Sequence, residues 1–203
     1  MSPTSRLLPL LLACPLFLTA CSSVDRTCLY GLGNHDRVLY RIDAEGSTAV
    51  GAISPVASNA DLALLEDAGE GLVYTIDRRA NTLHTLRLSD ARVVSTVRLD
   101  VDIWVTRRGL ARAPDGTLYG VLPGMQLRSI DPATGATMLI GPITGAEMVE
   151  ALAFTPDGEL FALGSAGTKF ANALYRIDTN TAAATFVADL PVPDADALTF
   201  AGG

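Results

Sequence analysis

Short segments in which apolar and polar residues alternate recur along the chain from about residue 28 onward. The clearest are 109–120 and 151–162, which both read apolar segment, Pro-Asp-Gly, apolar segment. Alternation with a period of two over five or six residues is typical of β-strands. Pro-Asp-Gly supplies the fixed φ, the side-chain acceptor and the left-handed position that a tight turn needs. Each segment therefore predicts a β-hairpin.

A second hairpin pattern follows each of these segments and also occurs near the N-terminus. The segments 38–43, 126–131 and 173–178 end in Ile-Asp and lead through a short turn into another alternating run. Asp at a strand end bonds back to the backbone of the following turn, so its recurrence predicts a turn role and not catalysis. The residues in question are Asp43, Asp131 and Asp178.

Joined together, the two hairpins make a unit of four short strands. When the first strands of the units are aligned, a leucine falls at the same place in each, and the units recur about every 40–50 residues. The aligned leucines are Leu62, Leu110, Leu152 and Leu198. Four short strands at this spacing are typical of β-propeller blades. The sequence therefore predicts an all-β fold, a β-propeller of four blades with four antiparallel strands each.

The two ends of the chain complement each other in this scheme. The first unit lacks its first strand, whereas 197–201 is a first strand with nothing after it. We expect this C-terminal strand to join the N-terminal blade and close the ring, which removes the open sheet edges. Two chains that meet in an eight-bladed ring, or an open fragment, are the alternatives. The predicted blades are 28–53 plus 197–201, 60–99, 105–141 and 147–190.

The Pro-Asp-Gly turns and the Ile-Asp-x-x-Thr-Gly pattern resemble the repeats of bacterial YVTN-type and NHL-like propellers. The resemblance extends over nearly all of 28–203, the predicted propeller domain. It implies the propeller fold but no particular activity, because unrelated functions share this fold.

The N-terminal segment predicts export. Arg6 precedes the apolar stretch 7–20, which is too short to span a bilayer as a permanent helix, since that takes about 20 residues. Leu-Thr-Ala-Cys at 18–21 resembles the bacterial lipobox. The resemblance implies that 1–20 is a lipoprotein signal peptide and that Cys21 is acylated, for example with palmitate. An ordinary signal peptide with a chance cysteine is the alternative.

The lipoprotein resemblance also implies a location. Residues 21–27 would form a lipidated tether, and Ser22 after the cysteine implies the outer membrane, with the protein facing the periplasm. The net charge of −7 should repel nucleic acid and anionic headgroups, so we expect no nucleic-acid partner and membrane contact through the lipid anchor alone.

One set of charged residues lies just before the aligned leucines. In propellers the first strands line the central axis, so we expect these residues to ring one mouth of it; they are Asp61, Arg108, Glu150 and Asp196. Three carboxylates could hold a hard cation such as calcium. A guanidinium among them would compete for the same oxygens and favours a salt-bridged plug instead.

Two further features receive a structural interpretation. His84 alternates with leucines, so we expect it to face outward on its strand. The pair Arg78 and Arg79 reads as solvated loop charges.

The sequence favours a non-catalytic envelope scaffold, monomeric or dimeric, that holds a protein, peptide or glycan partner with its loops and needs no cofactor. The alternative is a metal-dependent hydrolase or lyase of the propeller-lactonase type, with Asp61, Glu150 and Asp196 around an axial ion.

Overall fold

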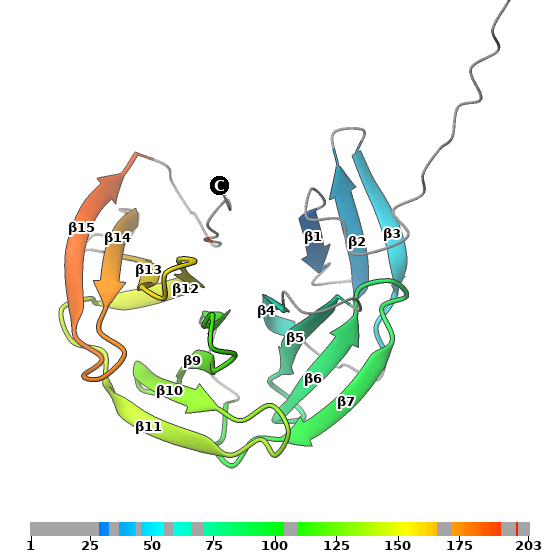
Figure 1. Ribbon diagram of the computed structural model, residues 1–203, viewed down its shortest axis with the longest axis horizontal. Coiled ribbons are helices and arrows are strands. Elements are labelled where there is room, and N and C mark those ends of the chain that lie inside the picture. The colour runs from blue at the N-terminus through cyan, green and yellow to red at the C-terminus, as the bar shows by residue number, and fades with distance from the viewer. Residues whose placement is uncertain are drawn as a thin grey trace, which may run out of the picture.

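The computed structural model describes residues 29–32, 37–43, 46–54, 59–65, 71–103, 109–165, 172–191 and 198. Within these ranges every regular element is a β-strand, and the strands form four antiparallel sheets (Figure 1).

Blade 1 consists of β1 (Leu29–Leu32), β2 (Val38–Asp43) and β3 (Gly46–Ala52). Blade 2 consists of β4 (Asn59–Leu65), β5 (Leu72–Asp77), β6 (Thr82–Arg87) and β7 (Val93–Arg98). Blade 3 consists of β8 (Leu110–Arg112), β9 (Leu118–Leu122), β10 (Gln126–Ile130) and β11 (Thr137–Pro142). Blade 4 consists of β12 (Met148–Phe154), β13 (Leu160–Ser165), β14 (Asn172–Ile177) and β15 (Ala184–Leu190). The described part of the chain holds no helix that is long and apolar enough to cross a membrane.

The four blades follow one another around an open arc, with blades 1 and 4 at its two ends (Figure 1). Strands β3, β7, β11 and β15 lie along the outer rim. At the inner edge, β8 contacts both β4 and β12, and β4 also contacts β1. The first strands of blades 2 to 4 therefore lie side by side toward the centre, as expected for strands that line a propeller axis.

The same register recurs in blades 2 to 4. The aligned leucine of each first strand faces an equivalent residue of the second strand: Leu62 faces Thr75, Leu110 faces Gly120, and Leu152 faces Ala162. The predicted Pro-Asp-Gly hairpins are confirmed. In blade 3 the Ala113 amide donates to the Thr117 carbonyl at 2.8 Å, and in blade 4 the Thr155 amide donates to the Glu159 carbonyl at 2.9 Å.

Ring closure stays a prediction. Blade 1 has three strands in the order β1-β2-β3. Leu198 is the only described residue of the segment 197–201, and it belongs to no strand. The remainder of that segment lies outside the described residues, as do the predicted signal peptide 1–20, the tether 21–27 and Cys21.

The hydrophobic core is divided among the junctions between blades. Leu39 and Ile53 of blade 1 pack against Val73 and Leu86 of blade 2. Two similar clusters of aliphatic side chains join blade 2 to blade 3 and blade 3 to blade 4. Each fully buried aliphatic side chain contributes about 1.5–3 kcal/mol, so every blade is stabilised mainly by its neighbours.

A second repeated contact, which we call the joint, lies near the rim. In blades 2 to 4 the turn between the third and fourth strands holds a residue with positive φ, namely Ala91 (59°), Gly135 (77°) and Ala182 (61°). These turns touch the last strand of the preceding blade: Ala91 lies on Gly51, Gly135 on the Arg98 carbonyl, and Gly141 on the turn that holds Ala182. A small residue is needed at each joint because backbone meets backbone there.

A third repeat fixes the start of each connector between blades. In blades 1 to 3, the residue after the last strand donates its amide to the carbonyl of the residue just before the neighbouring strand, and this accepting residue has a φ of 57° or 58°. The pairs are Ile53 to Arg37 at 2.7 Å, Leu99 to Asn81 at 3.0 Å, and Ile143 to Met125 at 2.7 Å.

Neighbouring strands of a blade are antiparallel. The first and third strands therefore begin at one edge of the blade, and the second and fourth strands end at that same edge. The connectors and the β5–β6 and β9–β10 turns therefore lie at this edge, which we call the connector face.

Candidate binding groove

The predicted axial residues are described only in part. Arg108 and Asp196 lie outside the described residues, and for Asp61 the backbone alone is described. Glu150 is half-buried on β12. Among the described residues, no group of three His, Cys, Asp or Glu side chains could hold a metal ion. The ring of Asp61, Arg108, Glu150 and Asp196 therefore stays a prediction.

The backbone nevertheless marks two of these positions. The pairing of β4 with β5 shifts register between Asn59 and Leu62, where Asp61 lies. The pairing of β12 with β13 shifts between Val149 and Ala151, at Glu150. Such bulges redirect side chains and are frequent beside functional sites. Both residues thus occupy irregular backbone positions of inner strands that flank β8, at the connector face.

The clearest hollow on the connector face is a groove of about 880 Å³ where blade 2 leads into blade 3. One wall is the β5–β6 turn and the other is the end of β7 with the connector that follows. The lining residues include Arg78, Arg79, Asn81, Arg98, Asp100 and Asp102. The interpretation of Arg78 and Arg79 as simple solvated charges missed this groove, because the opposite wall comes from a strand that lies about 20 residues later in the chain.

The first wall is held by a buried carboxylate. Asp77, only 1% exposed, accepts hydrogen bonds at Oδ1 from the backbone amides of Arg79 (2.9 Å) and Ala80 (3.0 Å). This turn fixes the backbone from which the Arg78 and Arg79 side chains extend.

The floor is fixed by a single amide side chain. Asn81 donates from Nδ2 to the Leu99 carbonyl (3.1 Å) and accepts at Oδ1 from the Ile103 amide (2.9 Å). Its own carbonyl accepts from the Leu99 amide. Leu99 and Ile103 are both buried, so the connector is fastened at two points and the two walls are tied together.

The second wall is tied to blade 3. Asp100 accepts at Oδ2 from the Thr137 amide (3.1 Å) and at Oδ1 from the Thr137 hydroxyl (2.8 Å). These bonds lower the pKa of the Asp100 carboxyl below its ordinary value. The Asp100 amide also donates to the Gly135 carbonyl. The groove is therefore built from segments held in place before any ligand arrives.

The expectation for His84 was wrong, because its side chain is 3% exposed. Its Nε2 lies 3.0 Å from the Thr82 hydroxyl and its Nδ1 lies 2.8 Å from the Thr96 hydroxyl. Burial lowers the pKa of His84, while Asp77 acts in the opposite direction. In a propeller both faces of a middle strand are covered by neighbouring blades, so alternation does not place either set of side chains in water.

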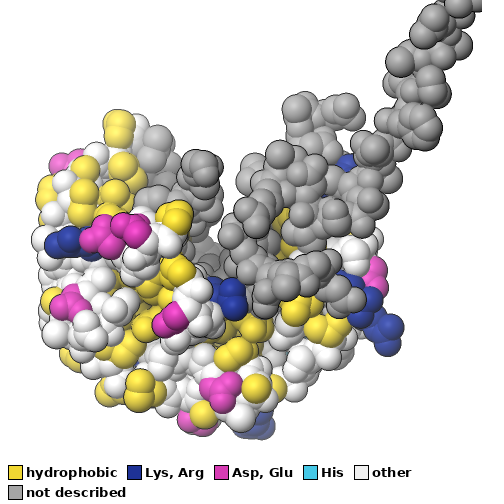
Figure 2. Space-filling model, in the orientation of Figure 1, with side chains coloured by type: hydrophobic (Ala, Val, Ile, Leu, Met, Phe, Trp, Pro, Cys, Tyr) yellow, Lys and Arg dark blue, Asp and Glu magenta, His cyan; other side chains and the backbone are white. Residues whose placement is uncertain are grey.

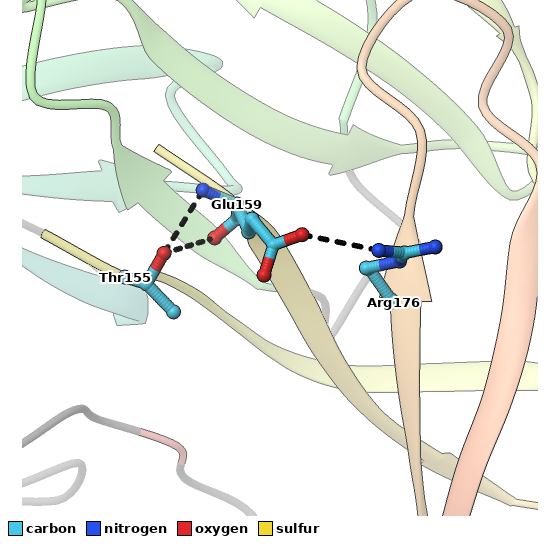
Figure 3. Close-up of polar contacts among 3 residues, drawn as sticks. All are labelled: Thr155, Glu159 and Arg176. Carbon is cyan, nitrogen blue, oxygen red and sulfur yellow. Dashed lines mark hydrogen bonds and ion pairs between the residues drawn. The ribbon is translucent and has the colours of Figure 1, made fainter. Parts of the chain in front are cut away.

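A second, smaller hollow of about 410 Å³ lies on blade 4 and includes Glu159 and Arg176. The two charges meet at 3.1 Å, and Thr155 bonds the Glu159 backbone through its hydroxyl (Figure 3). Both side chains are about half exposed. An ion pair in that setting contributes little, and its two charges satisfy each other, so this hollow offers a ligand less than the groove does.

The recurring aspartates have the predicted turn role where they are described. Asp131 accepts from the Ala133 amide at 2.8 Å, and Asp178 accepts from the Asn180 amide at 2.8 Å. The Thr134 hydroxyl also donates to Asp131, and this bond together with the Ala133 amide lowers the pKa of the Asp131 carboxyl. The Asn180 amide lowers the pKa of the Asp178 carboxyl. The side chain of Asp43 lies outside the described residues.

No family model matches the sequence, and no curated protein matches it. Several solved structures match the fold of this chain. A protein of unknown function from Bacteroides thetaiotaomicron matches with a TM-score of 0.60 and 13% identity, over 79% of this chain and 44% of that chain. A catalytically inactive virginiamycin B lyase from Staphylococcus aureus, solved with quinupristin, matches with a TM-score of 0.55 and 17% identity, over 85% and 56%. YCF48 bound to D1 peptide matches with a TM-score of 0.51 and 16% identity, over 80% and 51%.

These matches bear on the fold alone, and the chain spans about half the length of the solved structures it resembles. The YVTN-type resemblance and the lipoprotein signal stay predictions. The described blades and the solved structures together give the conclusion that this chain has an all-β fold of the β-propeller type.

Proposed function

We propose that the protein is a non-catalytic binding module of the bacterial envelope that holds a protein, peptide or glycan partner on its connector face. Acylated Cys21 would anchor it to the outer membrane on the periplasmic side. No cofactor is needed for this role.

One observation carries the proposal: the charged residues of the groove are not part of the repeat. Arg98 corresponds to Pro142 at the next junction, and the β9–β10 turn, which is one residue shorter than the β5–β6 turn, has Pro123, Gly124 and Met125 in place of the arginines. Residues that recur serve the fold, whereas charges found at one junction have no such explanation. That a propeller-type structure, YCF48, was solved bound to a D1 peptide supports peptide binding by this kind of scaffold.

We further propose that 197–201 pairs beside β1 as the missing first strand of blade 1. It would then close the arc within one chain and hold the blades, and with them the groove, in a fixed arrangement.

The test is a crosslinked pull-down from detergent-solubilised membranes, compared among the wild type, Arg79→Glu/Arg98→Glu and Arg92→Glu. Arg92 is an exposed arginine of the same blade, in the β6–β7 turn at the opposite edge, so its substitution repeats the charge change away from the groove. We expect a partner that copurifies with the wild type and Arg92→Glu. A protein that is recovered without any partner would contradict the proposed function.

The bulges at Asp61 and Glu150 favour one alternative, a metal-dependent hydrolase or lyase with an axial calcium ion. In that case calcium should raise, and a chelator lower, the melting temperature of the wild type but not of Asp61→Asn/Glu150→Gln. Glu147→Gln, an exposed carboxylate in the connector just before β12, is the control. A melting temperature that calcium leaves unchanged would exclude this site.

A further inference from the structure

The groove has an uneven supply of hydrogen-bonding groups. Its described side-chain acceptors already have partners: Asn81 is bonded at both ends of its amide, and both Asp100 oxygens accept from Thr137. Asp102 likewise has an interaction of its own. Arg79 and Arg98 are exposed, and neither makes an ion pair with any described residue. What the groove offers a ligand is therefore guanidinium N–H donors.

Elsewhere on the described chain, arginines are scattered, and only some of them pair with a carboxylate. The whole protein carries a net charge of −7, and in the space-filling view Lys and Arg form only small separate patches among apolar and acidic ones (Figure 2). Arg87, by contrast, pairs with Asp90 at 3.6 Å, and Arg176 pairs with Glu159. At the groove, Arg79 and Arg98 belong to its two walls, and their charges are left for a ligand.

We propose that this groove binds an acidic peptide segment of a protein partner, with its carboxylates on Arg79 and Arg98. The inference rests on the proposed function and names the ligand class of the same site. A guanidinium matches a carboxylate with two parallel hydrogen bonds. Two of them on opposite walls fit two carboxylates a few residues apart in an extended peptide.

Other anions fit less well. The groove lies in the size range of sites for small ligands, roughly 300–1,000 Å³, and is larger than a single inorganic anion requires. Among the described residues of its lining there is no aromatic side chain on which a sugar ring could stack. A nucleic acid would have to lie along a protein surface of the same charge sign. A short peptide can place its carboxylates on the two arginines, and Asp100 and Asp102 in the same lining disfavour a ligand with negative charge beyond those two positions.

The probe is a fluorescein-labelled (Asp-Gly)4 octapeptide, and (Asn-Gly)4 serves as the uncharged match. Fluorescence anisotropy with the wild-type protein should show binding of the acidic peptide only, weakening as salt screens the charges. Arg79→Glu/Arg98→Glu should weaken binding at least tenfold, whereas Arg92→Glu should leave it unchanged. The melting temperature of each variant verifies that it is folded.

Three results would overturn the inference. They are equal binding of both peptides, equal binding by the groove variant, and displacement of the peptide by inorganic phosphate or a sulfated disaccharide at lower concentration than by unlabelled peptide. The pull-down separates this failure from that of the proposed function. A partner retained by both variants would leave the binding module intact and move its site away from the groove.

Discussion

Substitution of Gly135 by alanine tests whether the joint between blades stabilises the arc. Gly135 has a φ of 77°, and a methyl group there would run into the Arg98 carbonyl of blade 2. Gly158 has a similar φ of 92°, but a methyl group at Gly158 would meet nothing within 4 Å. The two substitutions therefore impose the same kind of backbone strain, and only the first adds a collision between blades.

The magnitudes follow from these two contributions. Alanine in the left-handed region costs about 1–2 kcal/mol, and both variants carry that cost. Forcing extra volume into a packed contact costs a further ~1–3 kcal/mol, which applies to Gly135→Ala alone. One kcal/mol lowers the melting temperature of a domain of this size by about 2–4 °C. Gly135→Ala should then melt about 2–12 °C below Gly158→Ala.

The assay is urea unfolding followed by far-UV circular dichroism, with thermal melts on the same samples. Because the Gly135 carbonyl accepts the Asp100 amide in the groove wall, Gly135→Ala should also weaken binding of the acidic peptide, whereas Gly158→Ala should not. A difference in unfolding free energy below about 0.5 kcal/mol between the two variants, within the usual additivity error, would refute the view that the joint is tightly packed.

The remaining predictions concern charge and anchoring. The lowered pKa of His84 means that its neutral form stabilises the fold fully above the unfolded pKa of about 6.5, and this stability declines as pH falls below that value. Urea unfolding at pH 7.5 and 5.5 should show a smaller loss for His84→Gln than for the wild type; equal losses would contradict the assignment. Arg176→Ala should change the free energy of unfolding by less than about 1 kcal/mol, because the ion pair with Glu159 is exposed, and a larger loss would show that this pair is shielded from water. Cys21→Ser should abolish labelling by a palmitate analogue and release the protein from the membrane fraction; unchanged fractionation would refute lipid anchoring.

Local chemistry made much of the fold predictable. Pro-Asp-Gly determines its hairpin through the backbone preferences of three adjacent residues, and Asp131 and Asp178 form the turn bonds that their positions indicate. The leucine alignment agrees with the observed register because strand pairing within a blade depends on residues close in sequence.

The groove could not be predicted in the same way. Arg79 and Arg98 come together only through the pairing of β6 with β7 and the Asn81 bonds that fold the connector back. The prediction for His84 was wrong because the alternation rule assumes that one face of the sheet contacts water, whereas neighbouring blades cover both faces of a middle strand. Of the axial residues, Asp61 and Glu150 lie on inner strands, whereas Arg108 and Asp196 lie outside the described residues; the pattern carried no information on the bulges at Asp61 and Glu150.

The recurrence of one joint at three junctions has an evolutionary consequence. A blade that ends and begins with the same contact surfaces can be duplicated, deleted or exchanged as a whole without a new fit between neighbours. Selection on such an array can change one copy while the others maintain the architecture. The groove arginines lie at the junction between β7 and β8, where a change in one copy leaves the other joints intact.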